Sequence, residues 1–332
     1  YPEFEPNRYQ DYSRAHHLNQ SVTLGYEPCS TFKMITIAAG LSEGLISPDQ
    51  EFFCENGEYK IGINMIRDTS PHGLMTLQQV LKKSSNICAA KIGMSMPPTR
   101  FHEYIMRFGF GRRSNSGIAA EATGRVISPK KWQTIDHANI SFGQAILVSP
   151  LQMVSAANVF ANEGKWVPPF IVEYAVDKKG NKLQEIKDVE GKVSHKFGLG
   201  VRSPVVEGSV AELVRKYLIS VTQKGGTAQR AAILGYQVAG KTGTSQIYDQ
   251  QLGRYSQTRY IASFVGFAPA SDPLVTVLVV VEQPRTSIYG GTIAAPIFKE
   301  IVQRTLLFKD VLPFPEENSE GTTALLETTV IQ

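Results

Sequence analysis

Helical periodicity dominates the first half of the chain. The segment STFKMITIAAGLSEG, which begins at Ser30, repeats apolar residues at near-helical spacing and ends at Gly44. Ser30 is one of the residue types preferred at a helix N-cap, so it is expected to stand at the mouth of this helix. Between about residues 77 and 164 the pattern stays helical with frequent Gly and Pro breaks, in the segments TLQQVLKK, ICAAKIG, PTRFHEYIMRFG and PLQMVSAANVFAN. This stretch predicts a mostly α-helical lobe.

The second half combines helices with strands. Residues 207–224 carry the apolar stripe of a helix that packs on a core, and residues 294–307 repeat this pattern. Between them lie three runs rich in Val and Ile, ILGYQVAGKTGT, RYIASFVGFAP and LVTVLVVVEQ. Their near-continuous apolarity predicts strands that are covered on both faces. The turn over residues 269–273 favours antiparallel pairing of the last two.

Three segments are expected to lie outside these packed elements. Residues 1–26 lack sustained periodicity and predict an irregular lead-in. Residues 170–186 alternate and turn at 177–180, which predicts a hairpin with a four-residue loop that projects from the surface. After Asp310 the chain is rich in Pro, Glu, Ser and Thr and is predicted to be disordered.

Composition adds few constraints. At 332 residues the chain is long enough for about two domains or lobes. Its 42% hydrophobic and 19% charged residues are typical of folded rather than disordered or fibrous proteins. The net charge of +4 is too small and too scattered to indicate a nucleic-acid partner. The uncharged run over residues 138–162 contains several polar residues and Pro150, so it predicts a buried loop and helix rather than a membrane span.

Several kinds of site find no support in the sequence. Cys29, Cys54 and Cys88 are odd in number and widely spaced, which argues against a disulfide framework and against any Cys-x-x-Cys motif. The six His residues take no zinc-protease spacing, so no metal is predicted. No complete G-x-G-x-x-G or P-loop motif occurs, and no cofactor is predicted.

The first candidate chemistry is a nucleophile beside a base. Ser30 and Lys33 are three residues apart at a predicted helix start, so their side chains share one face. A neutral Lys amine can accept the Ser proton if desolvation and a nearby cation lower its pKa. Ser-x-x-Lys alone has little specificity, and Ser128 to Lys131 is a second match, which we assign to the solvated surface because no apolar helix follows it.

Two further motifs follow. Ser84-Ser85-Asn86 lies between two helical runs and offers a hydroxyl for proton relay and an amide for a substrate peptide group. Lys241-Thr242-Gly243-Thr244 ends a predicted strand, where Gly243 permits close approach and the Lys and Thr side chains offer donors to a carboxylate. Each motif alone is more often a helix cap or a strand end. Together and in this chain order, S-x-x-K, an S-x-N-type motif and K-T-G form the signature of β-lactamases and penicillin-binding proteins.

The chain resembles the transpeptidase domain of class B penicillin-binding proteins, from Tyr1 to about Phe308. Beyond the three motifs, the resemblance rests on YPEFEPNRY, YEPCSTFK, the CENG at Cys54, SFGQAILVSPLQMVSAANVFANEG, QKGGTAQRA and VAGKTGTSQ. It implies an α+β fold of the penicillin-binding and β-lactamase type, an antiparallel sheet flanked by helices with an all-α lobe. The expected parts are an all-α lobe at about 34–165, a hairpin insertion at about 166–200, a sheet lobe at about 201–308 and a disordered tail at 309–332.

The resemblance also implies a role for each motif residue. Ser30 is expected to be acylated by the penultimate D-Ala of a peptidoglycan stem peptide or by a β-lactam, with Lys33 as general base and Ser84 relaying a proton with Lys241. Asn86 is expected to hold the peptide. Lys241, Thr242 and Thr244 would bind the terminal carboxylate beside Gly243, and the backbone N–H groups of Ser30 and Thr244 would form the oxyanion hole. The implied activity is D,D-transpeptidation, with carboxypeptidase activity as a side reaction.

The chain departs from the family pattern at several places. Cys29 replaces the usual Gly before the nucleophile, and we interpret it as a buried, inert thiol. NQSVTL replaces the usual charged residues at 19–24. The family's first strands, pedestal domain and membrane anchor are expected to precede Tyr1, which would leave one sheet edge uncovered and would place the enzyme at the outer, periplasmic side of the bacterial cytoplasmic membrane. A membrane glycosyltransferase of the wall-synthesis complex is the implied partner.

Two alternatives stay open. A β-lactamase needs a deacylating base, yet Ser85 stands where class A enzymes have Asp, and no Glu between Asn86 and Lys241 is followed four residues later by Asn. Slow hydrolysis and transfer to an amine are therefore favoured. Cys29 and the missing start also motivate a non-catalytic penicillin-binding sensor or scaffold.

Overall fold

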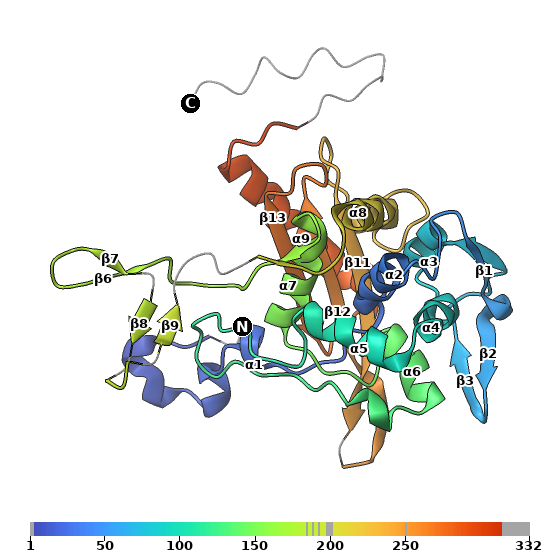
Figure 1. Cartoon of the computed structure of the whole chain (residues 1–332), viewed down its shortest axis with the longest axis horizontal. Coiled ribbons are helices and arrows are strands. Elements are labelled where there is room, and N and C mark those ends of the chain that lie inside the picture. The colour runs from blue at the N-terminus through green and yellow to red at the C-terminus, as the bar shows by residue number, and fades with distance from the viewer. Residues whose placement is uncertain are drawn as a thin grey trace.

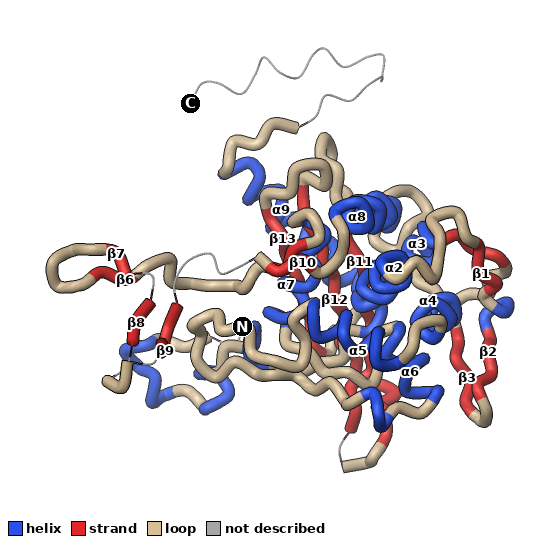
Figure 2. The backbone as a smooth tube through the Cα atoms, viewed as in Figure 1, coloured by secondary structure: helices blue, strands red, loops and turns tan. Residues whose placement is uncertain are grey.

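The computed structural model describes residues 3–183, 185–187, 189–191, 193–196, 202–249 and 251–313. A three-stranded antiparallel sheet stands at the centre, with helices around it and smaller strand pairs at the periphery (Figures 1 and 2). The α-helices are α1 (Gln20–Thr23), α2 (Lys33–Ser42), α3 (Leu77–Lys83), α4 (Asn86–Met94), α5 (Pro98–Arg107), α6 (Thr134–Ser141), α7 (Pro150–Ala161), α8 (Gly208–Thr222) and α9 (Gly290–Phe308). The 3-10 turns are η1 (Pro6–Asp11), η2 (Arg14–His17), η3 (Cys29–Phe32), η4 (Glu55–Gly57), η5 (Pro129–Lys131) and η6 (Gln229–Ala231).

The central sheet has the order β11 (Ala239–Asp249), β12 (Arg254–Ala268), β13 (Val275–Glu282). Helix α9 packs on β12 and β13 through the edge-to-face pair of Phe264 and Phe298, whose ring centroids lie 4.8 Å apart. Helix α7 covers the other face, where Asn158 Oδ1 accepts a hydrogen bond from Thr276 Oγ1 at 2.8 Å. The middle strand is therefore buried on both faces over its second half, as its apolar run predicts.

The remaining strands pair two by two. They are β1 (Glu51–Phe53) with β4 (Leu74–Thr76), β2 (Glu58–Ile61) with β3 (Asn64–Arg67), β5 (Lys165–Trp166) with β10 (Ser203–Pro204), β6 (Ala175–Val176) with β7 (Lys182–Leu183), and β8 (Glu185–Lys187) with β9 (Val193–Lys196). The pairs β6–β7 and β8–β9 project away from the helical body (Figure 1). The β6–β7 pair confirms the predicted hairpin and its turn at 177–180.

Side chains cap the starts of α3, α4 and α7, whereas α2, α5 and α8 have no side-chain cap. Thr76 and Gln79 form a capping box at α3, Ser149 and Gln152 form one at α7, and Ser85 caps α4. Each satisfies backbone N–H groups that the first turn of a helix leaves unpaired. Helix α2 is buried over most of its length and contacts α4, α5 and α8. It thus carries Lys33 into the centre of the molecule.

The structure corrects several expectations about these elements. The region over 34–165 is not all-α, because it contains β1 to β4 and begins β5. Helix α9 starts at Gly290, four residues before the predicted start. The apolar pattern misses this first turn because Gly290 and Gly291 have no apolar side chain. Both pack closely against backbone carbonyls. Ser30 lies inside η3 and is not the cap of α2, which begins at Lys33 without a side-chain cap. The predicted tail over 309–332 lies outside the described residues from 314 onward.

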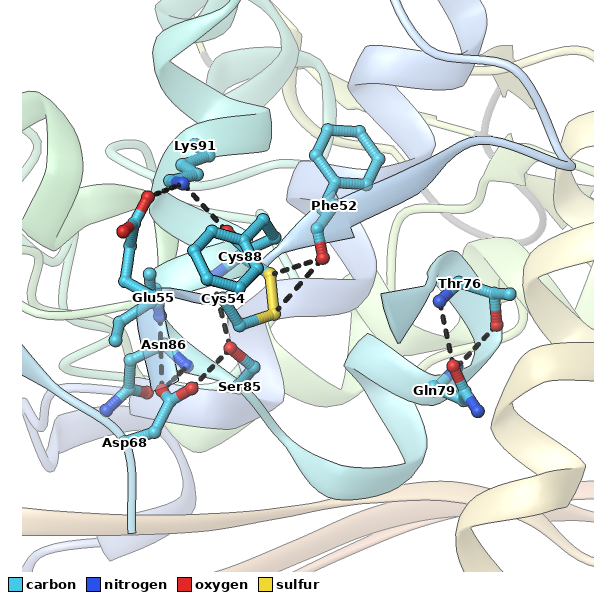
Figure 3. Close-up of a disulfide and its surroundings, with 12 residues drawn as sticks. Phe52, Cys54, Glu55, Asp68, Thr76, Gln79, Ser85, Asn86, Cys88 and Lys91 are labelled. Atoms are coloured by element: carbon cyan, nitrogen blue, oxygen red, sulfur yellow. Dashed lines mark hydrogen bonds and ion pairs between the residues drawn. A yellow bond between two sulfur atoms is a disulfide. The ribbon is translucent and has the colours of Figure 1, made fainter. Parts of the chain in front are cut away.

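Cys54 and Cys88 form a disulfide, against the expectation from cysteine number and spacing. Their Cα atoms lie 5.2 Å apart although the residues are 34 positions apart in sequence. The fold brings them together because the end of β1 lies against α4, where Lys91 Nζ donates to Phe53 O at 2.7 Å, so that Cys54 meets the third residue of α4 (Figure 3). Cys29 stays a buried free thiol, as expected.

The turn before α2 depends on an unusual backbone conformation. Cys29 has φ of 46°, in the left-handed region that Gly adopts readily and other residues rarely do. This conformation would be unstrained in a Gly residue. The Cβ of Cys29 therefore strains the turn that presents Ser30.

Replacing Cys29 tests this strain. At ordinary positions Ala is more stable than Gly by about 0.4–1 kcal/mol. Here we expect the reverse, with Cys29→Gly about 1 kcal/mol more stable than Cys29→Ala, because both remove the sulfur but only Gly removes the Cβ. Urea unfolding of the two variants measures the difference, and a more stable Ala variant would show that the turn is unstrained.

The disulfide is expected to stabilise the fold by about 3–4 kcal/mol, because it closes a loop of 34 residues in the unfolded chain. The double variant Cys54→Ala, Cys88→Ala should lose about that free energy of unfolding and become insensitive to reducing agent. Cys29→Ala is the control and should keep the response to reductant. Alkylation of all three cysteines in the unreduced, unfolded protein would contradict the disulfide.

Candidate active site

The nucleophile candidate Ser30 lies on η3, and two glycines let neighbouring segments approach this turn. The Cys29 amide donates to Gly143 O at 2.9 Å, and a Cβ on Gly143 would lie 2.2 Å from Cys29 O. A Cβ on Gly243 would lie 3.1 Å from Pro28 O and 2.4 Å from Ser263 Oγ. The turn is thus clamped between the SFGQ segment and strand β11, while Ser30 itself stays only half-buried.

Lys33 is fully buried directly behind Ser30. Its Nζ lies 2.9 Å from Ser30 Oγ, 2.7 Å from Asn86 Oδ1, and 2.5 Å and 3.2 Å from the carbonyl oxygen and Oγ of Ser84. Burial lowers the pKa of Lys33 to about 7, against the smaller opposing effect of the Asp68 carboxylate. A substantial fraction of Lys33 is therefore neutral at neutral pH and able to take a proton from Ser30.

Ser84 bridges the two lysines of the site. It ends α3 in the left-handed conformation, with φ of 65°, which turns its side chain toward the centre. Its Oγ lies 3.2 Å from Lys33 Nζ and 2.9 Å from Lys241 Nζ. The hydroxyl is placed to pass a proton between these groups.

Lys241 comes from strand β11 and is also fully buried. Burial lowers its pKa well below the ordinary value, and the neighbouring charge of Lys33 lowers it further. Besides Ser84, its Nζ contacts the carbonyl oxygen of Thr242 at 3.2 Å and Thr242 Oγ1 at 3.3 Å. The strand thus brings a second amine to the motifs carried by the helices.

Side chains alternate along β11, so that Thr242 and Thr244 lie on one face of the strand, and Lys241 Nζ reaches Thr242 Oγ1 from its neighbouring position. Thr242 Oγ1 lies 3.2 Å from Thr227 Oγ1, and Thr244 Oγ1 accepts from the Gly290 amide at 3.4 Å. These hydroxyls line the strand near the start of α9. The predicted site residues Ser30, Lys33, Ser84, Asn86 and Lys241 thus meet in one cluster, and the threonines extend it along the strand.

Three contributors escaped the sequence reasoning. Thr227 belongs to the QKGGTAQRA segment, whose resemblance to the family was the available signal. Asp68 accepts hydrogen bonds from the start of α4, and no motif marks it. Glu27 Oε1 accepts from the Ala145 amide at 2.9 Å and from Tyr255 Oη at 2.8 Å, which ties the segment before Ser30 to strand β12.

The second Ser-x-x-Lys sequence lies outside the cluster. Ser128 is exposed at the start of η5, in agreement with its assignment to the solvated surface. Among the described residues, no group of three or more His, Cys, Asp or Glu side chains could hold a metal ion. Within the same residues, no helix is both long and apolar enough to cross a membrane.

Comparisons with known proteins all indicate the same protein family. The family model of the penicillin binding protein transpeptidase domain matches residues 1–303. The probable peptidoglycan D,D-transpeptidase PenA of Neisseria flavescens is 31% identical over 94% of this chain and 72% of its own length. Stage V sporulation protein D of Bacillus subtilis is 32% identical over 92% of this chain and 46% of its own length. The chain spans about half the length of most of the curated relatives it matches.

Solved structures agree. The apo transpeptidase domain of penicillin-binding protein 3 from Burkholderia pseudomallei superposes with a TM-score of 0.78 at 31% identity, covering 90% of this chain and 84% of that one. Penicillin-binding protein 3 of Mycobacterium tuberculosis, complexed with aztreonam, gives a TM-score of 0.82 at 28% identity, covering 94% and 68%. With its α+β fold and the family model matched over nearly its whole folded length, the chain belongs to the transpeptidase domains of class B penicillin-binding proteins.

Proposed function

We propose that this chain is the catalytic domain of a peptidoglycan D,D-transpeptidase that works through an acyl-enzyme on Ser30 and is acylated by β-lactams. The observation that carries the proposal is the buried Lys33 amine, 2.9 Å from Ser30 Oγ and with its pKa lowered to about 7. Such a pair is a nucleophile with its general base in place. Relatives named peptidoglycan D,D-transpeptidase, and a structural relative complexed with ampicillin, support the reaction class.

Acylation follows from this geometry. Ser30 Oγ attacks the carbonyl carbon of the penultimate D-Ala while its proton passes to neutral Lys33. The tetrahedral intermediate collapses, the C–N bond to the terminal D-Ala breaks, and the leaving amine takes a proton through Ser84, which contacts both Lys33 and Lys241. The product is an ester of Ser30 with free D-Ala released. A β-lactam follows the same first step, with its ring amide as the bond that breaks.

Binding and charge stabilisation use strand β11. We assign the oxyanion hole to the backbone N–H groups of Ser30 and Thr244. Thr242 and Thr244 are the proposed hydroxyl donors to the substrate carboxylate, with Lys241 beneath them. Burial disfavours the charged form of Lys241 in the free protein. A bound substrate carboxylate would raise the pKa of Lys241 again, so that the amine takes up a proton. Asn86 is the proposed partner of the substrate peptide group.

Transfer of the acyl group to an amine of a second stem peptide completes the cross-link, while water in its place gives carboxypeptidase activity. The second motif carries Ser85, whose Oγ donates to Asp68 and accepts from the Cys88 amide, so it serves as the cap of α4. Both interactions of Ser85 are structural, and neither provides a base that could activate water. This arrangement favours a long-lived acyl-enzyme over rapid hydrolysis.

The wider setting extends the same proposal. The proposed catalytic domain spans residues 1–308, with helices and the strands β1 to β4 in the first half and the sheet β11–β13 with α8 and α9 in the second. We place it at the outer side of the bacterial cytoplasmic membrane, where its stem-peptide substrate lies, with a glycosyltransferase of wall synthesis as its partner. The name of the relative from Neisseria flavescens, a probable peptidoglycan D,D-transpeptidase, supports the peptidoglycan substrate of this setting.

A fluorescent penicillin tests the nucleophile. We expect one label per chain, on Ser30, that persists for many minutes, and complete loss of labelling in Ser30→Ala. Ser128→Ala is the matched control, since Ser128 heads the other Ser-x-x-Lys sequence and is exposed. It should label like the wild type. Rapid turnover of the drug would instead indicate a β-lactamase, and a folded wild-type protein that never acylates would indicate a scaffold.

The pH dependence of acylation tests the base. Since the pKa of Lys33 is lowered to about 7, its neutral fraction increases as pH rises through that value. The second-order rate constant for penicillin labelling should therefore rise about tenfold per pH unit below pH 7 and level off above it. Rapid-mixing measurements from about pH 5.5 to about pH 9, on both sides of the midpoint, follow this rise. A rate that is flat over this range, or that still rises steeply at its upper end, would contradict the assignment.

A further inference from the structure

The Ser84-Ser85-Asn86 motif forms the junction between α3 and α4. Ser84 ends α3 in the left-handed conformation and Asn86 is the first residue of α4. Ser85 stands between them as the cap, and its Oγ accepts from the Cys88 amide at 3.1 Å. Any shift of this junction moves the groups that contact Lys33, because Ser84 and Asn86 supply three of its close contacts.

One carboxylate outside the family motifs holds this junction. Asp68 follows strand β3, and its Oδ1 accepts from the backbone amides of Asn86 at 2.5 Å and Ile87 at 3.1 Å. Its Oδ2 accepts from Ser85 Oγ at 2.6 Å (Figure 3). Asp68 and Ser85 together therefore satisfy the first three amides of α4, and a negative charge at this end is favourable to the helix.

The same strand end also orients the Asn86 side chain. Arg67 O accepts from Asn86 Nδ2 at 2.8 Å, which directs Oδ1 of the amide toward Lys33 Nζ at 2.7 Å. Asp68 is itself fixed by its own amide, which donates to Gly57 O at 3.1 Å. Two consecutive residues of the β2–β3 hairpin thus hold both the backbone and the side chain of Asn86.

Asp68 also contributes charge. The groups that raise the pKa of Lys33 against the effect of burial are Asp68 after β3, which has the larger effect, and Cys29 on η3. Lys33 in turn lowers the pKa of Lys241 on β11. The hydroxyls of Ser30 and Ser84 and the Asn86 amide complete its surroundings. The Asp68 carboxylate therefore partly offsets the lowering of the Lys33 pKa by burial.

We propose that Asp68 is a positioning residue for acylation: its carboxylate fixes the Ser84–Asn86 junction against Lys33 and supplies a negative charge that acts on this buried amine. It acts through these residues without touching the substrate. The proposal rests on the proposed function, since it concerns the rate at which Ser30 is acylated. It differs from a purely structural helix cap because it links Asp68 to the protonation of Lys33.

The experiment compares the pH profiles of acylation by fluorescent penicillin for wild type, Asp68→Asn and Asp68→Glu. Asp68→Asn keeps an oxygen for the α4 amides and removes the charge. We expect its rising limb to shift to lower pH by about one unit, because loss of the carboxylate lowers the pKa of Lys33. We also expect its plateau rate to fall at least about tenfold, because the amide repels one donor of the junction. Asp68→Glu keeps the charge but displaces it, so its midpoint should stay while its plateau falls.

Glu58→Gln is the matched control, since Glu58 lies on the same hairpin and pairs with Arg67 on an exposed surface. Its profile should equal that of the wild type. An Asp68→Asn protein that is less stable but keeps the wild-type midpoint and plateau would reduce Asp68 to a helix cap and overturn the proposal. Should Asp68→Asn fail to fold, an unchanged plateau in Asp68→Glu would overturn it equally. If the wild type itself is not labelled, the proposed function fails, and this result is distinct from either outcome.

Discussion

The site depends on two lysine amines that are buried on either side of one serine hydroxyl. Lys33 and Lys241 are both fully buried, and Ser84 Oγ lies within hydrogen-bonding distance of each. Two ammonium groups cannot both be charged at low energy in such a place, since burial and mutual repulsion act in the same direction. We propose that burial and this repulsion leave a substantial fraction of Lys33 neutral as the base beside Ser30. Lys241 then binds a proton when the substrate carboxylate lies beside it. The same electrostatic constraint therefore supports both steps of the proposed reaction.

The fold serves this constraint by bringing three separate segments together. Helix α2 supplies Lys33, the α3–α4 junction supplies Ser84 and Asn86, and strand β11 supplies Lys241. Left-handed residues at Cys29 and Ser84 set the two turns, and Gly143 and Gly243 allow backbone to approach the nucleophile closely. The disulfide and Asp68 then secure the start of α4 from two sides (Figure 3). Much of the local backbone is thus shaped by the need to hold polar groups in a buried cluster.

The sequence predicted the elements with strong periodicity and the residues inside known motifs. The α8 helix, the antiparallel strands and the hairpin around Asp177 follow from local patterns, and the cluster at Ser30 follows from three motifs in order. Local patterns miss contacts between distant segments. The Cys54–Cys88 bond and the Asp68 contacts join the β1–β4 region to α4, and no sequence spacing encodes that approach. Ser30 was expected to cap a helix because its residue type favours caps, yet the positive φ of Cys29 places it inside a 3-10 turn and leaves its hydroxyl for Lys33.

The central claim is that Lys33 has a pKa of about 7, so that a substantial fraction of this amine is neutral at neutral pH in the resting protein. A direct measurement is a pH titration of the protein with isotopically labelled lysine side chains, followed by NMR, with Lys33→Arg used to assign the resonance. We expect a lysine resonance that titrates near pH 7 and is absent from the variant, in line with the pKa of about 7 that burial gives Lys33. A Lys33 resonance that stays protonated up to the ordinary lysine range of about 10 would contradict it.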